Sequence, residues 1–176
     1  GPWEDVLTIT QASANTYNEY TPTSQKTYAT WRFLSPEGGY CNVAELEFWA
    51  GGNKLSGSAF GDGGGAWGGS SNGFGKALDG DPATFYDANN GSSGFVGLTA
   101  ITCQPSTNPT PPPPPVTENP SGGGSGTSCA LTKVRLYARA GFAHRLVGGR
   151  IQGASGPSGP WEDVLTITQA SANTYN

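Results

Sequence analysis

The 176-residue chain has no methionine, one histidine and few charged residues, which make up 12% of the total. Because it lacks methionine, we expect a processed product or an internal piece of a longer protein. The formal net charge is −4 and no basic run occurs, so the sequence predicts no nucleic-acid partner. No apolar stretch approaches the roughly 18 residues of a membrane-spanning helix, so we expect no membrane span.

Glycine and proline are abundant, with 28 and 14 residues, and five Trp, seven Tyr and seven Phe accompany them. Gly, Ser, Thr and Asn with little charge are typical of strands joined by tight turns. The aromatic residues supply enough apolar bulk for a packed core, which excludes a wholly disordered chain.

The first eighteen residues, GPWEDVLTITQASANTYN, recur without a change as residues 159–176. A run of identities this long is no coincidence, and it indicates a repeating unit. One explanation is a tandem polyprotein seen as one period plus an overlap. A second is a subunit that carries an extra copy of one strand to exchange with a neighbour. An engineered duplication is a third and ranks last.

Alternating apolar and polar residues predict several short strands. In residues 43–49 the alternation puts Val43, Glu45 and Glu47 on one face and Leu46 and Phe48 on the other. The other expected strands cover residues 3–10, 28–34, 95–101, 131–137 and 146–152. Turn residues separate them, and this spacing predicts an all-β fold, an antiparallel β-sandwich.

Residues 104–128 differ, because they combine five consecutive prolines with a Gly/Ser run. We expect a loop insertion that leaves the sandwich as stiff polyproline II and then flexible chain. Cys103 and Cys129 bracket this insert, which predicts a disulfide between them and an oxidising compartment. The odd number of cysteines leaves Cys41 either unpaired or in an intermolecular bond. The alternative is three reduced, buried cysteines.

Five stretches carry a family pattern: KALDGDPATFYDA at 76–88, GFVGL at 94–98, LTKVR at 131–135, RAGFAHRLVGG at 139–149 and LSPEGGYCNVAELEF at 34–48. Together they resemble a discoidin-type (coagulation-factor C-type-like) carbohydrate-binding module, a galactose-binding-like jelly roll. The last stretch is similar to the module's C-terminal signature, yet here it stands first. The resemblance therefore implies that residues 1–51 form the C-terminal part of a module and residues 52–176 the N-terminal part of the same or the next module.

The resemblance also implies a structural Ca²⁺ site made by Asp79, Asp81 and Thr84, with Glu45 and the Ala77 carbonyl completing the shell. Ca²⁺ takes roughly 6–8 oxygen ligands, which a tight loop with two Asp residues can bring together. The alternative is an Asp-Gly turn with solvated carboxylates.

Where relatives carry sugar-contacting residues, this chain has Arg139, Phe142, His144 and Arg145, and Trp67 is a further stacking candidate in a Gly-rich loop. Arg and His donate to hydroxyl groups, and an aromatic face stacks on a pyranose ring. The alternative is surface Arg residues with Phe142 and Trp67 packed on the sandwich. Relatives often have a Cys near position 138 that could pair with Cys41, but this chain has Ala138. No catalytic constellation is present, so we expect no enzyme activity.

Two regions are candidates for glycosylation. Asn90 begins an Asn-Gly-Ser sequon. The insert resembles the hydroxyproline-rich, O-glycosylated stretches of algal and plant extracellular proteins, which implies glycans on Thr110, Pro111, Pro112, Pro113, Pro114 and Pro115. The alternative is a bare Pro-rich spacer.

The repeat and the resemblance favour a structural subunit of an extracellular glycosylated fibril, whose discoidin-like units join end to end to copies of themselves. Strand pairing would link the units through Val6, Leu7 and Ile9 and their copies Val164, Leu165 and Ile167. A contact of this kind that does not close produces a filament. The alternative is a carbohydrate-binding or adhesion module of a larger secreted protein or glycoside hydrolase, with a polysaccharide as partner.

Overall fold

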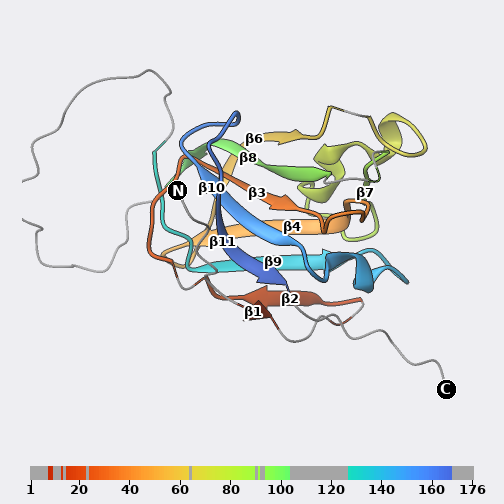
Figure 1. Cartoon of the computed structure of the whole chain (residues 1–176), viewed down its shortest axis with the longest axis horizontal. Helices are drawn as coiled ribbons and strands as arrows, with labels where there is room; N and C mark the ends of the chain where they lie inside the picture. Colours follow the sequence, from red (N-terminus) through yellow and green to blue (C-terminus); the bar gives the residue numbers. More distant parts are fainter. Residues whose placement is uncertain are drawn as a thin grey trace, which may run out of the picture.

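The computed structural model describes residues 8–9, 13, 15–22, 24–63, 65–89, 91, 94–103 and 127–167. These residues form two β-sheets that pack face to face as a sandwich (Figure 1), which confirms the expected all-β fold. Their helical content is limited to three short 3₁₀ turns, Ser70–Asn72, Phe74–Ala77 and Ala143–Leu146. In this part of the chain no helix has the length and apolarity to cross a membrane.

The first sheet has six strands in the order β1-β11-β10-β3-β8-β6. Their bounds are β1 Thr8–Ile9, β11 Glu162–Ile167, β10 Arg150–Ala154, β3 Thr30–Leu34, β8 Phe95–Thr102 and β6 Ser56–Gly61. All neighbours are antiparallel except β1 and β11, which run parallel.

The second sheet has the order β2-β9-β4-β5, and β7 pairs with β4 beside this path. Its strands are β2 Tyr17–Tyr20, β9 Lys133–Ala138, β4 Asn42–Ala50, β5 Asn53–Lys54 and β7 Tyr86–Asp87. Both sheets thus combine strands from before and after residues 51–52, so β2 to β4 belong to the same sandwich as the later strands.

The core lies between the sheets and is filled by alternate residues of the strands. In β9, Val134, Leu136 and Ala138 are buried, whereas Arg135 and Tyr137 between them are partly exposed. The largest fully buried side chains come from both sheets and the connecting segments: Trp31, Tyr86, Phe33, Phe48, Leu46, Ile101, Leu131, Leu136, Leu146 and Ile151.

Strands β3, β4, β8 and β9 begin and end within two residues of their expected bounds, whereas the start of β10 and the side-chain alternation of β4 differ from expectation for physical reasons. Strand β10 begins at Arg150, because Leu146 ends a 3₁₀ turn and Gly148 follows at φ +82°. In β4 the pairing register shifts between Val43 and Glu45, and Val43 packs in the core with Leu46 and Phe48. A bulge of this kind breaks the simple alternation from which we placed Val43 with the glutamates.

The strand directions define the two ends of the sandwich. Strand β8 ends at Thr102 and β9 begins at Lys133, so the chain leaves for the insert and returns from it at one end. At the other end, β9 finishes at Ala138 and leads into the 139–149 loop, close to β7 (Figure 1). This second end carries the candidate site.

Candidate functional site

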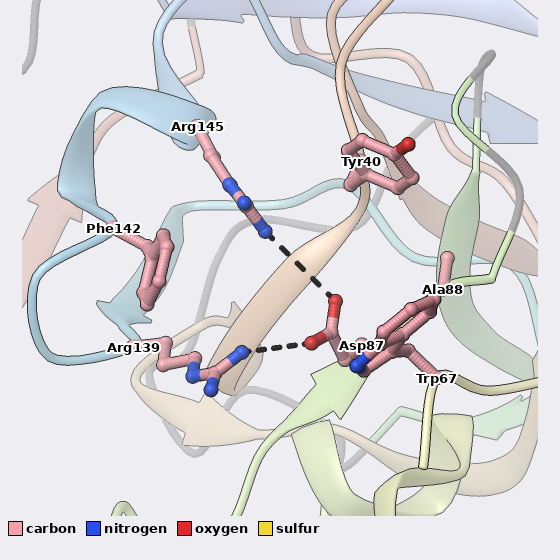
Figure 2. Close-up of a pocket in the computed structure, with 7 residues that line it drawn as sticks. All are labelled: Tyr40, Trp67, Asp87, Ala88, Arg139, Phe142 and Arg145. Atoms are coloured by element: carbon pink, nitrogen blue, oxygen red, sulfur yellow. Dashed lines mark hydrogen bonds and ion pairs between the residues drawn. The ribbon is translucent and has the colours of Figure 1, made fainter. Parts of the chain in front are cut away.

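A cavity of about 370 Å³ opens at the β7 end of the sandwich (Figure 2). Its lining comes from four separate parts of the chain and consists of Tyr40, Trp67, Asp87, Ala88, Arg139, Phe142 and Arg145. Four of the five residues that the sequence placed in a sugar site, Trp67, Arg139, Phe142 and Arg145, therefore lie together here.

Backbone hydrogen bonds hold the lining segments in place. The Trp67 amide donates to the Asp87 carbonyl at 2.7 Å, next to the bridge between Ala66 and Ala88. The amide of Phe142 donates to the Arg139 carbonyl at 2.9 Å, and the amide of Arg145 donates to the Phe142 carbonyl at 3.0 Å. Consecutive tight turns thus bring the three side chains of the 139–145 segment to one side of the cavity.

The buried carboxylate of Asp87 is the electrostatic centre of the cavity. It accepts a hydrogen bond from Arg139 Nη1 at 2.7 Å, and Arg145 Nη1 lies 3.9 Å from its other oxygen. Figure 2 shows both guanidinium groups directed at this carboxylate. One carboxylate facing two guanidiniums leaves the cavity with net positive charge and with donors in fixed positions.

Aromatic rings form the walls around these charges. The Arg139 guanidinium lies 3.9 Å from the Phe85 ring centroid and 4.6 Å from that of Phe142, and the Arg145 guanidinium lies 4.3 Å from Phe142. Trp67 is 67% exposed, so its ring offers an open face beside the cavity and is not packed in the core. Aromatic surface with a few fixed polar donors is the usual composition of a small-ligand site.

The structure departs from the sequence interpretation at three residues of this end. His144 is exposed and does not line the cavity; its ring centroid lies 6.2 Å from that of Phe142. Tyr40 and Asp87 line the cavity but were missed. Both stand inside sequence stretches on which the resemblance rests, and the paired strands β4 and β7 bring Asn42 opposite Asp87. Their proximity could not be found from spacing alone.

The expected calcium residues lie near one another at the loop 76–84. Oγ1 of Thr84 lies 3.0 and 3.1 Å from the two carboxylate oxygens of Asp79. It also lies 3.3 Å from the Lys76 carbonyl and 3.1 Å from the Asp81 carbonyl. In place of the expected Ala77 carbonyl, the carbonyls of Lys76 and Asp81 lie within hydrogen-bond distance of the Thr84 hydroxyl. The Asp81 carboxylate accepts from the Ala83 amide at 2.9 Å and so supports the turn.

Glu45 connects this loop to β4. Its Oε1 accepts a hydrogen bond from the Gly80 amide at 2.7 Å, and the residue is fully buried. Burial raises the pKa of Glu45 to about 7, although the Gly80 amide lowers it. Its second oxygen, Oε2, is buried without a hydrogen-bond partner among the described residues.

A buried carboxylate oxygen without a partner, beside a carboxylate, two carbonyls and a hydroxyl, matches the oxygen ligands of Ca²⁺. The groups that would hold the ion are the side chains of Glu45, Asp79 and Thr84 and the carbonyls of Lys76 and Asp81. Across the described ranges no group of three or more His, Cys, Asp or Glu side chains could hold a metal ion, so neutral oxygens would supply part of the shell. Lys76 Nζ lies 3.1 Å from the Asp79 carboxylate and neutralises its charge.

The disulfide between Cys103 and Cys129 is formed, with Cα atoms 6.0 Å apart, as the bracketing of the insert predicted. It indicates an oxidising compartment. Cys41 is buried and has no disulfide partner, and burial raises the pKa of its thiol. Position 138, where the resemblance implied a possible partner for Cys41, holds the buried Ala138.

Several predicted residues fall outside the described part of the chain. These are Asn90, Thr110, Pro111 to Pro115, Val6 and Leu7, together with the side chains of Ile9, Leu165 and Ile167. Of the six expected assembly residues, Val164 has a described side chain, and it is 1% exposed in β11. The described backbone places Ile9 directly opposite Ile167.

No protein-family model, curated protein or solved structure matches this chain. The fold itself is a two-sheet, largely antiparallel β-sandwich.

Proposed function

We propose that this chain is the structural subunit of an extracellular, glycosylated fibril in which discoidin-like sandwiches join end to end. The observation that carries this proposal is the position of the two copies of the repeated segment. The second copy supplies β11, which pairs with β10 and extends the six-stranded sheet. The first copy supplies β1, which pairs in parallel with β11, Thr8 opposite Thr166 and Ile9 opposite Ile167.

Equivalent residues of the repeat therefore lie opposite one another. Strand β10 has two neighbours, β3 and β11, so the sandwich offers one position beside β10 for two identical segments. The surplus copy lies at the edge of the sheet, where unpaired backbone groups favour pairing with another chain. If that copy fills the equivalent position of a neighbouring unit, the contact is head to tail and continues as a filament.

Other features of the chain agree with this role. The disulfide indicates an oxidising compartment, as expected for a secreted structural protein. Strand β8 ends and β9 begins at the end of the sandwich opposite the β7 cavity, so the insert that we propose to be glycosylated is attached away from that cavity. We further propose that Ca²⁺ at Glu45 and Asp79 fixes the 76–84 loop to β4 and stiffens each unit.

Electron microscopy of the purified chain tests the fibril directly. We expect filaments with an axial repeat set by one unit, and shuffled residues 1–18 with unchanged composition should abolish them. The mass of the denatured, reduced and deglycosylated native material then decides between separate subunits and a tandem polyprotein. Monodisperse single units at all concentrations would contradict the proposal.

A second candidate function is carbohydrate binding, which the β7-end cavity favours. Trp67 offers an open ring face, and Arg139 and Arg145 hold donors at the cavity floor around Asp87. A glycan array probed with the full chain tests this function. Binding by single units that never form filaments would support a carbohydrate-binding module over a fibril subunit.

A further inference from the structure

We infer that the position beside β10 is a peptide-binding site that recognises the sequence Trp-Glu-Asp-Val, and that its partner is the N-terminal segment of a second copy of this chain. The identity of the partner rests on the proposed fibril. The recognition itself rests on contacts that the second copy makes within the chain. Strand pairing alone accepts many sequences, because backbone hydrogen bonds carry little side-chain information. The side chains of residues 161–164 supply the sequence specificity that backbone pairing lacks.

Trp161 is the aromatic anchor of the segment. Its ring stacks on Phe60 with centroids 5.9 Å apart and an interplanar angle of 13°. The Arg32 guanidinium lies 4.0 Å from the Trp161 ring and 4.7 Å from the Phe95 ring. Rings from β6 and β8 and a cation from β3 thus form a cage that fits one large aromatic side chain.

The two acidic residues that follow Trp161 each meet basic or hydroxyl groups. Glu162 accepts hydrogen bonds from Lys26 Nζ and the Tyr28 hydroxyl, both at 2.6 Å. The buried carboxylate of Asp163 accepts from Gln152 Nε2, and from Arg150 Nη1 at 3.1 Å. These cationic partners select an acidic side chain at each of the two positions after Trp, since a basic side chain at either position would be repelled.

A bulge fixes the register of the segment. Strand β10 pairs Ile151 with Leu165 and Gln152 with Asp163, so Val164 has no opposite residue. Both Asp163 and Val164 are buried as a result, although adjacent strand residues normally point to opposite faces. A shift by one residue would remove the valine from its buried position and the acids from their partners.

The first copy has the same four residues, Trp3, Glu4, Asp5 and Val6. The residues that line the position beside β10 therefore cannot distinguish the two copies by their side chains. Which copy binds depends on where each copy is attached in the chain. The second copy, tethered to β10, has an effective concentration in the millimolar range, as expected for a short linker. In an assembly of many units, the first copy of a neighbour competes for the same position.

The test uses the full chain with Trp3→Ala and Trp161→Ala, which removes the anchor from both copies, and a labelled peptide GPWEDVLTIT. We expect this peptide to bind the variant and to raise its thermal midpoint. The control peptide GPAEDVLTIT should bind roughly tenfold more weakly or worse, because the stacking and cation–π contacts are lost. Equal affinity for the two peptides, or no binding by a variant with an intact β-sheet circular dichroism spectrum, would overturn the inference.

If the double variant does not fold, the unaltered chain decides the question. Millimolar GPWEDVLTIT should compete with the tethered copy and bind, whereas GPAEDVLTIT should not. If the chain forms filaments but binds GPWEDVLTIT and GPAEDVLTIT equally well, the proposed recognition is wrong and the proposed fibril is unaffected. Selective peptide binding without filaments at any concentration would overturn the fibril and the second-copy partner, while supporting recognition of the chain's own second copy.

Discussion

At the scale of single residues, burial and charge determine what each candidate side chain can do. Asp87 is buried between two guanidiniums and therefore organises the cavity, whereas the exposed His144 lies outside its lining. Trp67 has the opposite character, because its exposed ring contributes little to the core and remains free to stack on a ligand. Substitutions at these residues should therefore separate binding from stability.

For carbohydrate binding, Trp67→Ala should weaken affinity about tenfold or more, because a stacking face is lost. The thermal midpoint should change little, since the ring is largely exposed. Isothermal titration with a glycan selected on an array measures the first effect, and differential scanning calorimetry measures the second. Phe74→Ala is the matched control, because Phe74 is also exposed, at 36%, but lies outside this cavity. Equal losses in both variants would argue against the site.

The pH dependence of the repeated segment should follow Glu162. Hydrogen bonds from Lys26 and Tyr28 lower the pKa of Glu162 from its ordinary value of 4.5. The ionised form therefore stabilises the fold above about pH 4.5, and this contribution disappears as the pH falls through the lower folded-state value. The effect should be small, because the side chain is 52% exposed.

The measurement is the denaturant midpoint of the wild-type chain minus that of Glu162→Gln between pH 7 and pH 3. We expect a positive difference that is constant above pH 5 and shrinks at lower pH. Glu37→Gln, on the exposed turn before Gly38, should show no such change. A difference that grows in acid would contradict the assigned hydrogen bonds.

At the scale of elements, close approach between strands and loops limits which residues can be changed. Gly153 of β10 lies against the Tyr28 ring, and a Cβ atom at this position would overlap Cδ2 of Tyr28. Tyr28 in turn stacks edge-on against Trp31 at 5.0 Å and donates to Glu162. The absence of a side chain at Gly153 thus allows Tyr28 to reach both the core and β11.

Gly153→Ala should therefore lower the free energy of unfolding by about 1–3 kcal/mol, as overpacking does in a tight core. Gly156→Ala is the control, because a Cβ atom there would meet nothing within 4 Å. Urea unfolding of both variants measures the difference. Equal stability of the two variants would mean that Tyr28 moves aside at no cost.

The disulfide is the second element-scale constraint. It links Cys103, just after β8, to Cys129, 26 residues later in the sequence. Because it closes a loop of this length, replacing both cysteines by serine should destabilise the fold by roughly 3 kcal/mol, chiefly through the entropy of the unfolded chain. Urea unfolding measures the loss, and the wild-type chain under reducing conditions should match the variant. Unchanged stability would show that the insert is already constrained.

At the scale of the whole molecule, strand β4 connects the cavity with the candidate calcium loop 76–84. Tyr40 lies just before β4 at the cavity, and Lys54 of the neighbouring strand β5 pairs with Glu47 of β4 at 3.0 Å. Between them, Glu45 joins β4 to the loop around Gly80. A cation held there would therefore fix the loop to β4.

Calcium should stabilise the fold by about 2.7 kcal/mol at a concentration one hundred times its dissociation constant. A chelator should remove this increment, and Glu45→Gln should abolish it, because a neutral amide is a weaker ligand for a hard cation. Thermal unfolding with calcium and with chelator measures the increment, and Glu37→Gln should keep it. A stability that calcium leaves unchanged in the wild-type chain would exclude this ion from the site.

Local sequence patterns predicted much of the sandwich, because alternation of apolar and polar residues acts within each strand. This local rule identified β3, β4, β8 and β9 to within one or two residues. It did not identify β6, Ser56–Gly61, since small and polar residues carry no clear alternation. Likewise, the 139–149 stretch indicated three lining residues of the cavity and the Gly-rich loop indicated Trp67, but neither indicated the carboxylate of Asp87 between the two guanidiniums.

The sequence by itself determined the class of fold, the disulfide that closes the insert and the existence of two identical segments. All three depend on composition, on local alternation or on identity, which can be read along the chain. Tertiary structure alone decided that the second copy lies beside β10, that Trp161 reaches Phe60 and Arg32, and that Asp87 lies between Arg139 and Arg145. Contacts between residues far apart in sequence depend on sheet order and register, which no local pattern encodes.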